Sequence, residues 1–307
     1  MCVQAFEYLP VGSVSAAVAA LAAGGGAARP LSGGTDLIAQ LKEGRRSVER
    51  VIDLKRIPEL NELRVTAEGG AWVGAAVTCR TLNQHRDFIQ RFPGVYDSTH
   101  LIGGVQIQGR ATLGGNLCNA SPAADSIPNL IVHRVRVHLM GPQGARVVPV
   151  EAFCLAPGRT VLADGELVVS LEFPPSPREF GAAYLRFTPR NEMDIAVAGA
   201  AVAVELESGA RRFRSLRLAL GAVAPTPLLV ESAAEQLAGR QVDEAALVLL
   251  GALARAAARP ITDLRGTEVQ RQHLAEVLSI RALRRALDRA RGTCTVDALG
   301  RPFDHAE

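Results

Sequence analysis

Three prolines within four residues, Pro174-Pro175-Ser176-Pro177, divide the chain and constrain its fold more than any other feature. Proline lacks a backbone N–H and has a fixed φ, so neither a central strand nor a helix continues through such a run. The 307 residues are about twice the length of a ~150-residue domain. The sequence therefore predicts one domain over 1–177, with subdomains at about 1–55 and 56–177, and a second domain over 178–307.

The order of predicted elements after the prolines indicates the fold class. Three strands are predicted first, at 183–188, 196–205 and 214–221, and three helices follow, at 228–238, 243–257 and 267–289. Strands that precede helices, rather than alternating with them, are typical of an α+β domain. Before the prolines, a short extended piece and a glycine-rich turn lead into a helix that ends near Gly44. We expect an α+β protein overall.

The cysteines argue against a metal cluster. The chain has five of them, without a CxxC pair or a Cys/His pair at zinc spacing: Cys2, Cys79, Cys118, Cys154 and Cys294. An odd, sparse set also argues against a disulfide framework and favours a reducing, cytoplasmic location. We expect neither a secretory signal nor a membrane span, because the apolar stretch at 14–26 is shorter than the ~20 residues that a bilayer requires.

The charge pattern argues against nucleic-acid binding. The formal net charge is only +3, and aromatic residues make up 4% of the chain, so basic side chains with interleaved stacking groups are missing. The densest basic run, from Arg281 to Arg291, falls on the last predicted helix. Such a run is typical of a solvated helix face, and an acidic protein partner is the next alternative.

Two short segments, 32–35 and 112–116, concentrate glycine where no regular element needs it. Backbone N–H groups that no side chain shields form a cradle suited to a pyrophosphate, and two such loops could grip a dinucleotide from both sides. Isolated tight turns would explain the same residues. The chain has no GxGxxG, Walker or GxSxG motif. From the residues alone, the loops indicate only a candidate phosphate site.

The segment from Gly103 to Pro128 has no hydrophobic periodicity. We predict an irregular loop of more than twenty residues there, which is uncommon inside a compact domain unless the loop has a function. Its small apolar residues and scarcity of charge argue against disorder.

Three motifs resemble one family. The first motif is Leu31-Ser32-Gly33-Gly34-Thr35-Asp36-Leu37. The second consists of Ala111-Thr112-Leu113-Gly114-Gly115-Asn116 with Ala120-Ser121-Pro122-Ala123-Ala124-Asp125. The third is Arg190-Asn191-Glu192-Met193-Asp194-Ile195-Ala196. In this order the motifs resemble the FAD-binding medium subunit of molybdenum hydroxylases, the xanthine dehydrogenase and carbon monoxide dehydrogenase family. The match spans essentially the whole chain.

The resemblance implies a fold and a set of cofactor contacts. It implies an FAD-binding domain of the vanillyl-alcohol-oxidase (PCMH) type with two α/β subdomains, and a C-terminal domain built from a three-stranded antiparallel sheet and helices. Ser32, Gly33, Gly34 and Thr35 would line the pyrophosphate, with Asp36 beside them. The opposing wall would consist of Thr112, Leu113, Gly114, Gly115 and Asn116. Asp125 would accept hydrogen bonds from FAD hydroxyls, and Ile102 and Val168 would pack against the rings.

The resemblance also implies a function. The chain would be an electron-transfer subunit, an oxidoreductase without a catalytic acid or base of its own. A molybdopterin-binding large subunit would oxidise the substrate, and a small subunit with [2Fe–2S] clusters would relay electrons to FAD. FAD would then reduce NAD, a quinone or oxygen. Two alternatives stay open: a stand-alone FAD-dependent dehydrogenase, and a scaffold subunit that has lost the cofactor.

One position departs from part of the family. The animal xanthine dehydrogenases place a lysine where Val197 stands, so the resemblance implies that this flavin contact is absent here, which weakens the case for direct NAD reduction. Tyr184 and Phe187 are candidates for stacking on the flavin, although core packing is the commoner role of such residues. Arg190 and Asp194 would either pair with each other or approach the flavin edge.

Overall fold

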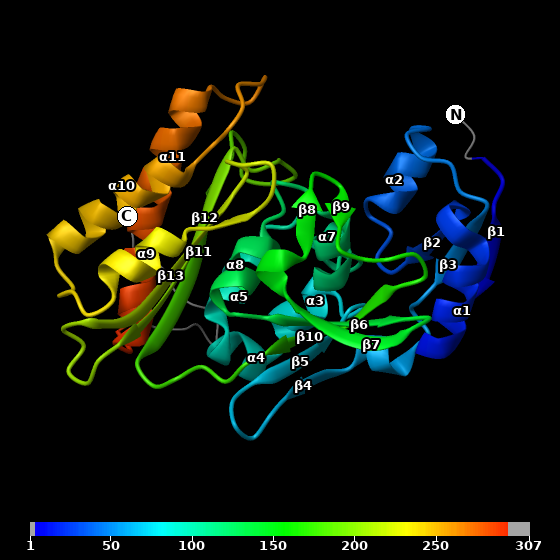
Figure 1. Cartoon of the computed structure of the whole chain (residues 1–307), viewed down its shortest axis with the longest axis horizontal. Coiled ribbons are helices and arrows are strands. Elements are labelled where there is room, and N and C mark those ends of the chain that lie inside the picture. Colours follow the sequence, from blue (N-terminus) through cyan, green and yellow to red (C-terminus); the bar gives the residue numbers. More distant parts are fainter. Residues whose placement is uncertain (1–3, 294–307) are drawn as a thin grey trace.

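The computed structural model describes residues 4–293, which form three larger sheets side by side and one two-stranded hairpin (Figure 1). The first is a parallel sheet with the strand order β1-β3-β2. Its elements are β1 (Glu7–Pro10), α1 (Val14–Gly24), the 3₁₀ turn Gly25–Ala27, β2 (Ala28–Leu31), α2 (Leu37–Lys42) and β3 (Arg50–Asp53). Parallel strands need crossover connections, and α1 and α2 supply them. The carboxyl end of β2 thereby leads directly into the turn at Ser32.

The second sheet is antiparallel, with the order β4-β5-β10-β6-β7. Its strands are β4 (Leu63–Val65), β5 (Ala71–Gly74), β6 (Arg136–Gly141), β7 (Gly144–Pro149) and β10 (Leu167–Phe173). Short helices pack against it: α3 (Cys79–Gln84), α4 (Arg86–Arg91), α5 (Pro93–Thr99), α6 (Val105–Gln108), α7 (Leu113–Asn119) and α8 (Ser126–Val132). The 3₁₀ turns Pro58–Asn61 and Val150–Ala152 and the hairpin of β8 (Cys154–Ala156) and β9 (Arg159–Thr160) complete this part.

The structure corrects the prediction of a long irregular loop over 103–128. The segment contains α6, α7 and the start of α8, none longer than seven residues. Helices this short show less than two periods of hydrophobic spacing, so the sequence pattern does not reveal them. Leu113 and Leu117 anchor α7 in the core, and both are buried.

The C-terminal sheet has four strands instead of the three that the resemblance implied. They are β11 (Phe180–Phe187), β12 (Ala198–Leu206), β13 (Phe213–Gly221) and β14 (Leu228–Leu229), in that order. Leu228 and Leu229 pair with β13, so the helix expected from residue 228 begins only at Glu231. Pro225 and Pro227 disfavour helical backbone at the residues before them, so the chain reaches Leu228 outside a helix.

Three helices cover one face of the C-terminal sheet, and their ends agree closely with the sequence prediction except at the start of the first. They are α9 (Glu231–Leu237), α10 (Glu244–Ala257) and α11 (Glu268–Ala290). Alternate residues of the strands divide between two cores: Ala183 and Val202 face these helices, whereas Tyr184 and Ala201 belong to the core of the N-terminal part. The α+β class is therefore confirmed.

A buried ion pair joins the two parts of the chain. Asp97 on α5 accepts two hydrogen bonds from the Arg289 guanidinium on α11, at 2.5 and 2.8 Å, and both side chains are at least nine-tenths buried. Asp97 also accepts the backbone N–H of Tyr184 on β11 at 3.0 Å. The C-terminal sheet is thus held in one position against α5. Within residues 4–293, no helix is long and apolar enough to cross a membrane.

Candidate functional site

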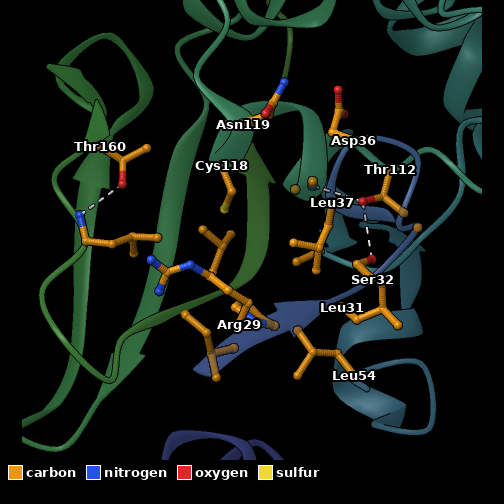
Figure 2. Close-up of a pocket in the computed structure, with 18 of the residues that line it drawn as sticks. Arg29, Leu31, Ser32, Asp36, Leu37, Leu54, Thr112, Cys118, Asn119 and Thr160 are labelled. Atoms are coloured by element: carbon orange, nitrogen blue, oxygen red, sulfur yellow. Dashed lines mark hydrogen bonds between the residues drawn. The ribbon is translucent and has the colours of Figure 1, made fainter. Parts of the chain in front are cut away.

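A cavity of about 770 Å³ opens between the parallel subdomain and the antiparallel one. The turn after β2, the first turn of α7 and the β8–β9 hairpin with the segment up to Val168 form its walls (Figure 2). The structure brings together here most residues that the sequence singled out: Ser32, Gly33, Gly34, Thr35, Asp36, Ile102, Thr112, Gly114, Gly115, Asn116 and Val168. Segments about eighty residues apart in sequence therefore share one cavity.

The turn after β2 presents unpaired backbone donors. Within residues 4–293, no hydrogen bond uses the N–H groups of Gly33, Gly34 or Thr35. Gly34 has φ of +80°, a conformation that favours glycine. A Cβ on Gly33 would lie 2.1 Å from the carbonyl oxygen of Arg110, so glycine is required where this turn meets the loop before α7. The close contact keeps the two glycine segments at a defined separation.

The first turn of α7 forms the opposite wall. Thr112 is its N-cap, and the Thr112 Oγ1 atom accepts the N–H of Gly115 at 2.9 Å. A Cβ on Gly114 would lie 2.6 Å from the carbonyl oxygen of Ala75, so the helix packs tightly on the residue after β5. Ser32 Oγ lies 3.4 Å from Thr112 Oγ1, which links the two walls directly.

The Thr112 cap gives a prediction about stability. Thr112→Ala removes the acceptor for the Gly115 N–H, and we expect the free energy of unfolding to fall by about 1 kcal/mol. Thr112→Ser keeps the hydroxyl and should stay within a few tenths of a kcal/mol of the wild type. Chemical denaturation of the three proteins measures both values. Equal losses in the two variants would show that the methyl group, and not the cap, stabilises this turn.

Two residues from the sequence-based set do not line the cavity. Leu113 is in the core of the N-terminal part. Asp125 lies at the N-terminus of α8, where its carboxylate accepts the Tyr184 hydroxyl at 2.8 Å and an Arg186 N–H at 2.6 Å. Burial raises the pKa of Asp125 to about 6, and the Arg186 guanidinium opposes this shift. Both of its oxygens are engaged within the protein, and its contact with cofactor hydroxyls stays a prediction.

Asn116 connects the cavity to the C-terminal domain. Its Oδ1 atom accepts the Ser126 hydroxyl at 2.6 Å, so its amide N–H groups remain as donors beside the cavity. Ser126 directly follows Asp125, which binds Tyr184 and Arg186 on β11. Tyr184 is buried with its hydroxyl engaged, whereas Phe187 is partly exposed. The Asn116 end of the cavity is therefore the end that lies toward β11.

The structure adds cavity residues that the sequence analysis missed. Arg29, Leu54, Arg159 and Leu162 line the cavity, although no motif marks them. Cys118, which lies within the second motif, is exposed to the cavity, and desolvation by the surrounding protein raises the pKa of its thiol to about 12. At neutral pH this thiol is protonated and a poor nucleophile.

Two other expectations concern charges. Arg190 and Asp194 form an ion pair at 3.6 Å, so the structure supports the pairing alternative.

Within residues 4–293, no group of three or more His, Cys, Asp or Glu side chains is arranged to hold a metal ion. Val197, where the resemblance places the lysine of the animal xanthine dehydrogenases, is fully buried. Cys2 and Cys294 lie outside the described residues.

Comparisons with known proteins agree with this geometry. Residues 4–176 match the family described as the FAD binding domain in molybdopterin dehydrogenase, and residues 183–286 match the CO dehydrogenase flavoprotein C-terminal domain. The chain is 33% identical over 287 residues to the carbon monoxide dehydrogenase medium chain of Afipia carboxidovorans, a match that covers 93% of this chain and 98% of that one.

Two further comparisons give the same result. The chain is 29% identical over 266 residues to the xanthine dehydrogenase FAD-binding subunit of Escherichia coli O157:H7, covering 86% of this chain and 90% of that subunit. A chain in a solved structure of carbon monoxide dehydrogenase from Hydrogenophaga pseudoflava superposes with a TM-score of 0.90 at 32% identity. That superposition covers 94% of this chain and 99% of the other.

Proposed function

We propose that this chain, which belongs to the family of FAD-binding medium subunits of molybdenum hydroxylases, carries FAD within a heteromeric oxidoreductase. In this proposal it takes electrons from a partner subunit with [2Fe–2S] clusters and passes them to an external acceptor, which is NAD, a quinone or oxygen. A molybdopterin-binding large subunit oxidises the substrate. The cytoplasmic location expected from the cysteines is part of the same proposal.

The observation that carries the proposal is the pair of glycine segments facing each other across one cavity. Gly33, Gly34 and Thr35 offer free N–H groups, and Asn116 offers an amide from the other side. Neutral donors that approach closely are the groups that bind a pyrophosphate. A cavity of about 770 Å³ is also within the range of cofactor sites, roughly 300–1,000 Å³. The residues present therefore fit FAD.

The residues of this chain would bind and orient the cofactor. When bound, FAD would supply the one- and two-electron redox chemistry that the protein side chains lack. Gly33 to Thr35 would hold the pyrophosphate through backbone donors, and Asn116 would donate to ribityl or phosphate oxygens. Ile102 and Val168, both in the lining, would exclude water from the rings. In this scheme, none of these side chains serves as a general acid or base.

The proposed partners follow from what the chain lacks and from its relatives. The relatives named above include medium chains of carbon monoxide dehydrogenase, which are parts of larger enzymes. Among residues 4–293, no three or more His, Cys, Asp or Glu side chains are arranged to hold a metal ion. An FAD subunit that is not the site of substrate oxidation requires an electron donor, and an iron–sulfur subunit has the matching one-electron chemistry.

Purification of the tagged chain with its partners tests the proposal. We expect the complex to contain flavin, iron and molybdenum in fixed ratios and to show flavin absorbance. Gly114→Asp should lose most of the flavin, because the new side chain meets the Ala75 backbone and forces the first turn of α7 away from its position in the cavity wall. Gly12→Asp is the matched control, since nothing lies within 4 Å of a Cβ there. A wild-type complex without flavin would refute the proposal, as would full flavin content in Gly114→Asp.

A further inference from the structure

The Arg29 side chain extends from β2 into the cavity, toward the segment that follows Thr160 and below Cys118 (Figure 2). It is only half-buried, and within residues 4–293 its side chain makes one hydrogen bond, a local one from Nη1 to the carbonyl oxygen of Ala28 at 3.0 Å. Arg29 forms no ion pair within residues 4–293. Most of the donors of this guanidinium therefore have no partner within residues 4–293, and the side chain lines the cavity in which a ligand would lie.

The surroundings of Arg29 suit a flat aromatic group better than a second anion. Leu31, Leu37 and Leu54 line the cavity beside it (Figure 2). Burial is the main cause that lowers the pKa of Arg29, followed by repulsion from Arg46, whereas Asp164 opposes the shift. The guanidinium is thus charged but partly desolvated. A cation in that state stacks on an aromatic face more strongly than a fully hydrated one does.

The position of Arg29 indicates which part of a dinucleotide it meets. Asn116 marks the end of the cavity that lies toward β11, through Ser126 and its neighbour Asp125. Arg29 lies on β2, in the parallel sheet on the opposite side of the molecule from β11 (Figure 1). In the proposed function, the pyrophosphate of FAD lies at the glycine turns and the isoalloxazine lies toward the C-terminal domain. The adenosine of FAD would then lie at the Arg29 end of the cavity.

We propose that Arg29 is the positioning residue for the adenine ring, which stacks on its guanidinium plane between the aliphatic side chains of β2 and the segment after β9. This inference rests on the proposed function. It adds the residue of this chain that would recognise the adenine base. The Arg29 contact belongs to the adenine base and is separate from the donors of the pyrophosphate turn.

Ligand titrations test this inference. They use the full chain in the complex with which it co-purifies, after the flavin has been removed. FAD binding is followed by flavin fluorescence, and ADP binding by calorimetry. We expect Arg29→Ala to weaken both ligands by a similar factor of about 10, the size that a partly desolvated cation–π contact gives. Arg29→Lys keeps the charge without the plane and should lose most of the same affinity. Arg64→Ala removes an exposed arginine that lies outside the cavity lining, and it should change either affinity less than twofold.

Each result supports or overturns the inference. Parallel losses for FAD and ADP in Arg29→Ala, with little rescue by lysine, support stacking on adenine. Full affinity of Arg29→Lys would overturn it, because charge alone would then suffice. A loss for FAD without a loss for ADP would also overturn it, since the contact would then be to the flavin. If the wild-type chain binds no FAD, the proposed function fails. If it binds FAD and Arg29→Ala binds equally well, only the inference fails. Unchanged thermal unfolding of the flavin-free variants controls for misfolding.

Discussion

Gly33→Ala is expected to weaken FAD binding by about 100-fold or more. The added Cβ would lie 2.1 Å from the Arg110 carbonyl oxygen and 2.8 Å from its carbon. Both are backbone atoms, so the turn after β2 and the loop before α7 must move apart. The free N–H groups of Gly33 to Thr35 then leave their positions. Hydrogen bonds to charged groups contribute about 1.5–3 kcal/mol each, so losing one or two is enough for this effect.

Gly109→Ala is the matched control for this change. Gly109 lies in the same loop, directly before Arg110, but a Cβ there meets its nearest atom at an ordinary 3.7 Å. Its φ of −67° suits alanine. We expect the control to bind FAD as the wild type does, with both affinities measured by fluorescence titration. Equal FAD affinity of Gly33→Ala and Gly109→Ala would show that the contact between the two glycine segments does not shape the site.

Asp97→Ala is expected to lower the free energy of unfolding by about 3–5 kcal/mol. The change removes a carboxylate that receives two guanidinium hydrogen bonds from Arg289 and one N–H from Tyr184. The Arg289 side chain, which is 5% exposed, keeps its charge but loses this carboxylate. Removing one partner of a buried ion pair is costly because the other charge stays buried without its counter-charge. The same change weakens the contact between α5 and α11, which joins the two domains. Calorimetric unfolding should show a lower midpoint and separate transitions for the two parts.

Two further variants test whether the burial of the charge causes this loss. Glu276→Ala breaks the exposed pair with Arg255, and we expect it to cost less than about 1 kcal/mol. Asp97→Ala combined with Arg289→Met removes both charges, so the double variant should be more stable than Asp97→Ala alone. A double variant that is less stable by the sum of both single losses would show that the two side chains act independently.

Much of the fold can be predicted from local patterns. Helices α10 and α11 span several turns, so their hydrophobic spacing is unambiguous and their ends agree closely with expectation. The short helices α6 to α8 could not be found in this way, and neither could β14. Two residues, Leu228 and Leu229, become a strand only because the edge of β13 offers them partners. No local signal distinguishes them from the start of a helix.

The candidate site shows the same division. The glycine segments at 32–35 and 112–116 are visible in the sequence because each turn needs glycine, at Gly34 for its φ of +80° and at Gly114 for its contact with Ala75. Nothing in the sequence marks Arg29, whose role depends on which residues face it across the cavity. Asp125 belongs to a specific motif, yet the structure turns its carboxylate to Tyr184 and Arg186.

The sequence by itself determined the α+β class, the two glycine segments and the family. These features depend on single residue types at fixed local spacing, and the sequence shows such spacing directly. Only the tertiary structure decided that the two segments share one cavity, that Asp97 and Arg289 join the domains, and that Arg29 lines the same cavity. Such contacts connect residues that are tens to nearly two hundred positions apart. Chain folding, and no local rule, brings them within hydrogen-bond distance.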